Sequence, residues 1–163
     1  MIVAEALHER RKRIVRYAPL IIWISVIFFL SSGEASMSHT SYFVEPVLRF
    51  FYPDITDVTL QIYHGYVRKA AHLTEYAALG FLASRVFYSS SHAFLRNRWF
   101  AVAAVAVLIV ASLDEFNQSF EPSRTSSTRD VLIDLAGGVT ATVLYWMWHA
   151  RSRTSGNEGI IRR

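Results

Sequence analysis

The sequence DEFNQSFEPSRTSSTRDVLID, residues Asp114–Asp134, connects two long apolar runs of the chain. A pair of polar side chains spaced four residues apart lies at each end of this stretch: Asp114 with Gln118, and Asp130 with Asp134. This spacing places the two members of a pair on one face of a helix. Charged side chains that face inward where helices enter or leave a bilayer are costly and usually mark a functional site. We therefore treat this stretch as part of a site that the rest of the chain holds in place.

The composition is that of a membrane protein. The chain has 163 residues, enough for one compact domain, and is 52% hydrophobic but only 18% charged. The net charge of +4 does not indicate nucleic-acid binding, because the Lys and Arg residues flank the apolar runs and do not alternate with aromatic residues. The chain has no cysteine, which excludes disulfides, thiolate nucleophiles and Cys-ligated zinc.

Four segments have the length and apolar character of membrane spans, if the third extends through Gln118. They are residues 14–30, 67–88, 99–113 and 131–149, preceded by a basic N-terminus (1–13) and followed by a basic tail (150–163) that we expect to fray. The longest connection, 31–66, contains an amphipathic segment, Tyr42–Phe51, which predicts a short interfacial helix in the first outer loop. Pro53 ends this helix, and an amphipathic turn or two, Val58–Tyr66, leads into the second span. The predicted fold class is all-α: a polytopic membrane protein with a four-transmembrane-helix bundle.

The distribution of Lys and Arg predicts the orientation. With both termini in the cytoplasm, twelve of the 17 basic residues lie on the cytoplasmic side and five lie outside. The positive-inside rule favours this topology, in which a multi-pass membrane protein has its N- and C-termini in the cytoplasm.

In this topology the unusual polar residues of three spans lie at the same outer level. Arg68, His72 and either Glu75 or Tyr76 share one face of the second span. In the same way, Asp114 and Gln118 share one face of the third span, and Asp130 and Asp134 share one face of the fourth. The predicted site consists of Arg68, Lys69, His72, Glu75, Tyr76, Asp114, Glu115, Gln118, Arg124, Asp130 and Asp134.

Three interpretations of this site remain open. The first is a structural polar layer. In it Arg68 or Lys69 pairs with Asp114 or Glu115, and Arg124 or Arg129 pairs with Asp130 or Asp134. The second is binding of an anionic or polar envelope molecule through Arg124, Arg68 and Lys69. The third is catalysis at the outer leaflet, for which the candidates are His72, Asp114 and Asp130, although no nucleophile motif accompanies them.

Two further features of the sequence concern metal binding and helix packing. His72 with Asp114, Asp130 and Asp134 could ligate a metal, but their spacing matches no standard metal motif, so we predict no metal and no other cofactor. The pair Gly137-Gly138 is interpreted as a point of close helix packing.

Two blocks of the sequence, RKAAHLTEYAALG (Arg68–Gly80) and the stretch from Asp114 to Gly138, resemble the VanZ-like family of bacterial membrane proteins. The matching positions are Lys69, His72, Tyr76, Asp114, Glu115, Gln118, Arg124, Asp130, Asp134 and Gly138. The pair Ser31-Ser32 is also similar to family members. The chain departs from the family pattern at Glu121-Pro122-Ser123, where Pro-Gly is commoner, and at Asp134, where Asn is frequent.

The resemblance covers about residues 14–148 and implies a setting more than a reaction. The namesake of the family is associated with low-level resistance to the glycopeptide teicoplanin. We therefore expect a VanZ-like membrane domain over 14–149 whose outward-facing polar pocket binds or acts on a lipid-linked or cell-wall anionic molecule. The expected partners are the lipid bilayer and this ligand, without nucleic acid. The alternatives are an accessory protein whose polar layer only stabilises the bundle, and a membrane-embedded enzyme of phosphoryl or glycosyl transfer.

Overall fold

The computed structural model describes residues 2–31, 37–120 and 128–161, and these form helices and short connections without a strand. Along this part of the chain the helices are α1 (Ile2–Ser31), α2 (Met37–Phe51), α3 (Asp57–Tyr88), α4 (Ala93–Asn97), α5 (Trp99–Gln118) and α6 (Thr128–Ile161). The predicted all-α class is confirmed. The third predicted span does extend through Gln118, at the end of α5.

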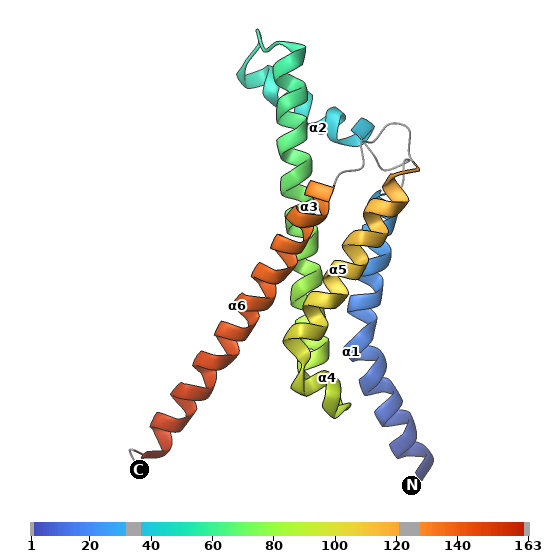
Figure 1. Cartoon of the computed structure of the whole chain (residues 1–163), viewed down its shortest axis with the longest axis vertical. Coiled ribbons are helices and arrows are strands. Elements are labelled where there is room, and N and C mark those ends of the chain that lie inside the picture. Colours follow the sequence, from blue (N-terminus) through green and yellow to red (C-terminus); the bar gives the residue numbers. More distant parts are fainter. Residues whose placement is uncertain (1, 32–36, 121–127, 162–163) are drawn as a thin grey trace.

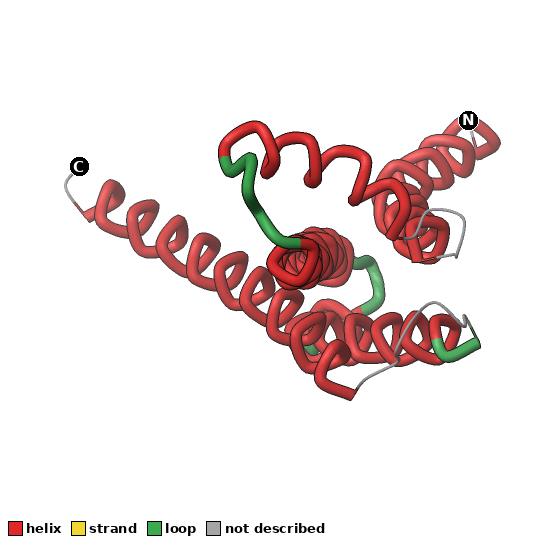
Figure 2. The backbone as a smooth tube through the Cα atoms, turned by 90° about the horizontal axis from the view of Figure 1, so that it is seen from above, coloured by secondary structure: helices red, strands yellow, loops and turns green. Residues whose placement is uncertain are grey.

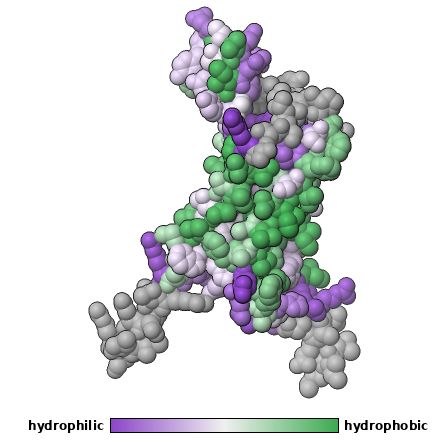
Figure 3. Space-filling view, in the orientation of Figure 1, coloured by the Kyte–Doolittle hydropathy of each residue, from purple (hydrophilic) through white to green (hydrophobic). Residues whose placement is uncertain are grey.

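Three of the helices are long and apolar enough to cross a membrane. The candidate spans are Arg10–Ser31 in α1, Trp99–Gln118 in α5 and Arg129–Ser152 in α6, with 22, 20 and 24 residues. A bilayer core of about 30 Å needs about 20 helical residues, so each suffices. Apolar side chains gather in the middle of the molecule and hydrophilic ones towards its ends (Figure 3). Helix α3 is long but too polar to qualify on hydropathy, so its role as a fourth span stays a prediction.

Helix α3 is the centre of the fold. It contacts α1, α2, α4, α5 and α6, and the other long helices surround it in both views (Figures 1 and 2). The boundary predicted at Val67 was wrong, because one continuous helix of 32 residues begins ten positions earlier, at Asp57. The Thr56 side chain accepts a hydrogen bond from the backbone N–H of Thr59, which caps the helix, and an acid in the first turn suits its dipole.

The segments outside the apolar helices differ partly from the predictions. The helix expected over Tyr42–Phe51 is present as α2 and begins earlier, at Met37. The Arg49 side chain bridges Glu45 and Asp57 at 2.9 Å each, which ties the end of α2 to the start of α3. The tail expected to fray is helical instead, since α6 continues to Ile161. The start of α1 and the end of α6 lie at the same end of the molecule (Figure 1).

Glycines bring α3 and α6 into close contact. A Cβ on Gly80 would collide with the backbone of Gly138, and a Cβ on Gly137 would collide with the carbonyl oxygen of Leu73. A Cβ on Gly138 would collide with Val107 of α5. The interpretation of Gly137-Gly138 as a packing point is therefore confirmed, and this contact fixes how the polar faces of the two helices meet.

Candidate functional site

A network of buried hydrogen bonds joins α1, α3 and α5. The Tyr76 hydroxyl donates to Asp114 Oδ2 at 3.2 Å, and Gln118 Nε2 donates to the same oxygen at 2.9 Å. The Gln118 amide also donates to the Ser31 hydroxyl at 3.3 Å. All four side chains are at most 4% exposed, so these bonds replace water that cannot reach them.

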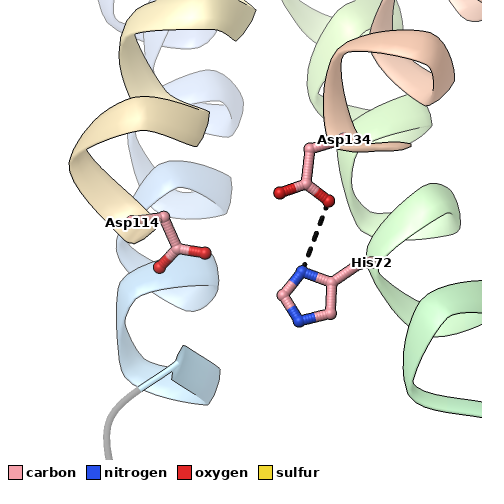
Figure 4. A group of neighbouring side chains, drawn as sticks. All are labelled: His72, Asp114 and Asp134. Atoms are coloured by element: carbon pink, nitrogen blue, oxygen red, sulfur yellow. Dashed lines mark ion pairs between the residues drawn. The ribbon is translucent and has the colours of Figure 1, made fainter. Parts of the chain in front are cut away.

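A second interaction joins α3 to α6. His72 Nδ1 lies 3.4 Å from Asp134 Oδ1, and the two side chains are 12% and 1% exposed. Figure 4 shows both side chains, with Asp114 facing them from α5. The His72 ring lies nearly parallel to the Tyr76 ring, with centroids 6.5 Å apart, so the two aromatic residues of α3 form one wall of the site.

The edge of the site is charged and partly exposed. Arg68 Nη2 lies 3.4 Å from Asp130 Oδ2, with side chains 27% and 19% exposed. The prediction that Arg68 pairs with Asp114 or Glu115 was wrong, because the crossing of α3 and α6 brings Asp130 next to Arg68. The Lys69 side chain is exposed. A small cavity at this edge is lined by Arg68, Lys69, His72, Asp130, Ile133 and Asp134.

The other predicted site residues lie around this centre or outside the described chain. Glu75 is half-buried, and its backbone carbonyl accepts a hydrogen bond from Trp23 Nε1 at 2.9 Å. Glu115 is buried beside Asp114 on α5. Arg124 falls within residues 121–127, which the structure does not describe. The structure therefore brings together His72, Tyr76, Asp114, Gln118 and Asp134, with Arg68, Lys69 and Asp130 at the edge.

Two side chains of α1 were missed as parts of the site. The sequence marks Ser31 only through the family resemblance, and it gives no sign of a role for Trp23. A polar residue at the end of an apolar run is the signal that could have indicated Ser31, because its hydroxyl needs a partner inside the bundle. Both hold α1 against the helices that carry the site.

The opposite end of the molecule has a different character. A cavity of about 590 Å³ lies between the first half of α1, the end of α3 and the second half of α6. Its lining residues are His8, Arg11, Lys12, Val15, Arg16, Arg85, Tyr88, Ser89, Tyr145 and His149. Basic side chains thus gather at the end remote from the acidic cluster.

Long apolar helices with a buried polar cluster define an α-helical membrane protein. The chain matches the family model VanZ/LLP1 over residues 17–149, and it belongs to that family. The resemblance inferred from Arg68–Gly80 and Asp114–Gly138 is therefore confirmed. Comparisons with curated proteins and with solved structures gave no match.

Proposed function

We propose that this chain is a four-span inner-membrane protein that binds an anionic lipid-linked or cell-wall molecule at its outer face. The observation that carries the proposal is the meeting of polar side chains from α3, α5 and α6 in one layer, with Arg68 and Lys69 at its edge. A polar layer built only for stability does not require an exposed lysine beside it.

The fourth span in this proposal is α3. Among its polar residues, Arg68, His72 and Tyr76 turn towards α5 or α6. Intramembrane polar groups that face a bundle interior are compatible with a span. The basic cavity at the other end of the molecule supports a cytoplasmic location for that end, as the positive-inside rule favours.

The proposed ligand contacts are the two cations at the edge. Guanidinium and ammonium groups bind phosphate and carboxylate oxygens through charge-assisted hydrogen bonds. Arg68 is held by Asp130, so its guanidinium is already positioned, while Lys69 is free to turn towards a ligand from the membrane surface. We extend the teicoplanin association of the family to this chain on the same basis: a protein that binds an envelope precursor or polymer changes what a glycopeptide reaches.

A second candidate is a purely structural role for the layer. It is favoured by the hydrogen bonds that link Tyr76, Asp114, Gln118 and Ser31, since a buried network of this kind rigidifies a bundle without any ligand. The two candidates differ at Lys69, which takes no part in that network.

The discriminating experiment is the Lys69→Ala variant, with Arg98→Ala as the matched control, an exposed basic residue at the opposite end. The purified proteins are mixed in detergent with a polyprenyl phosphate or the matching neutral polyprenol, and bound lipid is measured by native mass spectrometry. We expect the phosphate to be retained by wild type and Arg98→Ala, and roughly tenfold less by Lys69→Ala, the loss of one charge-assisted contact. The proposal is rejected if all three proteins retain the polyprenyl phosphate equally. It is also rejected if the wild type retains the neutral polyprenol as well as it retains the phosphate.

The orientation is tested separately with single cysteines, which the chain otherwise lacks. Asp54→Cys lies in the exposed turn between α2 and α3, and Ser91→Cys in the exposed turn before α4. An impermeant thiol reagent applied to intact cells should label position 54 only. Labelling of position 91 only places the site on the cytoplasmic side.

A further inference from the structure

Three potential metal ligands meet in the candidate site, one from each of α3, α5 and α6. His72, Asp114 and Asp134 each offer one ligand atom, and these atoms all lie within 4.8 Å of one another. Figure 4 shows the three side chains projecting into the same space between the helices. No local sequence motif predicts this meeting, because each residue comes from a different helix.

The distances suit one divalent cation. Ligand nitrogens and oxygens about 2.0–2.2 Å from a tetrahedral ion are about 3.4 Å apart. The separation of His72 Nδ1 and Asp134 Oδ1 is 3.4 Å. The remaining separations are at most 4.8 Å, so the three ligand atoms must move closer together when an ion binds.

Two buried atoms of the site, one on His72 and one on Asp134, make no hydrogen bond with the described residues. Asp134 is 1% exposed, and its Oδ1 accepts no hydrogen bond from the described residues; His72 Nδ1 makes none either. Their contact is an ion pair only when the imidazole is protonated, and its geometry is not that of a hydrogen bond. A buried carboxylate oxygen without a hydrogen bond is costly, and a cation between the two atoms removes that cost.

A small cavity adjoins His72 and Asp134, and Asp114 is not among its lining residues. It has a volume of about 10 Å³ and is lined in part by His72 and Asp134. That is roughly the space of one water-sized sphere, so it has room for a water beside an ion held by the three ligands and is too small for an organic ligand. The positive charges on its wall are Arg68 and Lys69, and Asp130 offsets the first of them at 3.4 Å.

We propose that His72, Asp114 and Asp134 bind one divalent transition-metal ion, with Zn²⁺ as the leading species. Imidazole nitrogen with two carboxylates is a ligand set suited to zinc and its neighbours, and three protein ligands leave a position open for water or an anion. Hydrogen bonds from Tyr76 and Gln118 to Asp114 Oδ2 hold that carboxylate in place, as outer contacts of metal ligands do. This site replaces the expectation from spacing that no metal is bound.

The metal site does not depend on the proposed envelope ligand, because the ion is measured on the purified chain alone. The full chain in detergent is stripped with a chelator and titrated with Zn²⁺ by calorimetry, and with Co²⁺ by visible absorption, in excess Mg²⁺. We expect about one equivalent of Zn²⁺ and a Co²⁺ absorption band. The Asp134→Asn and His72→Ala variants should each bind at least about tenfold more weakly, the loss expected when a metal site is damaged. His64→Ala, which removes a half-buried histidine two turns earlier on α3, should bind like wild type.

Circular dichroism and the elution volume of each variant report whether it is folded. Asp134→Asn is the more conservative of the two ligand variants, because it keeps the size of the side chain. Gln118→Ala removes an outer contact without removing a ligand, and should weaken binding by about 10–100-fold. If the variants do not fold, the wild-type chain alone tests the proposal. A folded wild-type chain that takes up no Zn²⁺, and whose Tm does not rise with Zn²⁺, overturns it. So does Zn²⁺ binding that is equal in wild type, His72→Ala and Asp134→Asn, because the ion is then held elsewhere.

Discussion

Substitution of the glycine at the crossing of α3 and α6 should destabilise the protein more than its small size suggests. In Gly80→Ala the added Cβ meets the carbonyl oxygen and the Cα of Gly138, which are backbone atoms and cannot turn aside as a side chain can. The two helices must therefore separate. Overpacking of this kind costs about 1–3 kcal/mol. For a chain of this size, that corresponds to a Tm lower by roughly 2–12 °C.

The same helix provides a matched control. Gly65 also lies in α3, but a Cβ there has no neighbour within 4 Å. Because alanine favours the helix over glycine by about 0.5–1 kcal/mol, Gly65→Ala should leave the Tm unchanged or raise it slightly. Thermal unfolding of the three purified proteins in the same detergent, followed by circular dichroism at 222 nm, measures the difference. A Gly80→Ala variant as stable as wild type and Gly65→Ala contradicts the close crossing and the site geometry that depends on it.

Two further substitutions separate the buried from the exposed parts of the site by the same assay. Tyr76→Phe removes the hydroxyl that donates to the buried Asp114, and should destabilise by about 1.5–3 kcal/mol, as for a hydrogen bond to a charged group. Asp130→Asn breaks a partly exposed ion pair with Arg68, and should change stability by only about 0–1 kcal/mol. The opposite order, with the larger loss in Asp130→Asn, contradicts the division into a buried network and an exposed edge.

The sequence predicted the parts of the site that depend on spacing along one helix. Asp114 and Gln118 are four residues apart, and the structure places both in the last turn of α5, joined by a hydrogen bond of 2.9 Å. The early start of α3 was also readable in principle. Thr56 with Asp57 is a recognisable helix beginning, but the sequence pattern predicted only an amphipathic turn or two over Val58–Tyr66.

Contacts between helices could not be read from spacing, because they depend on how the helices are rotated and where they cross. Arg68 pairs with Asp130, and not with Asp114 or Glu115, for this reason. The crossing is set by Gly80 and Gly138, whose positions in the sequence do not reveal that they touch.

The glycine contact and the polar site are parts of one arrangement. Asp134 lies one helical turn before Gly138, so the point where α6 touches the backbone of α3 also determines how closely Asp134 approaches His72. Any widening of that contact moves a buried carboxylate away from the imidazole that faces it. The stability of the crossing and the affinity of the proposed metal site should therefore fall together in Gly80→Ala, whereas Tyr76→Phe should affect the site through Asp114 and leave the crossing in place.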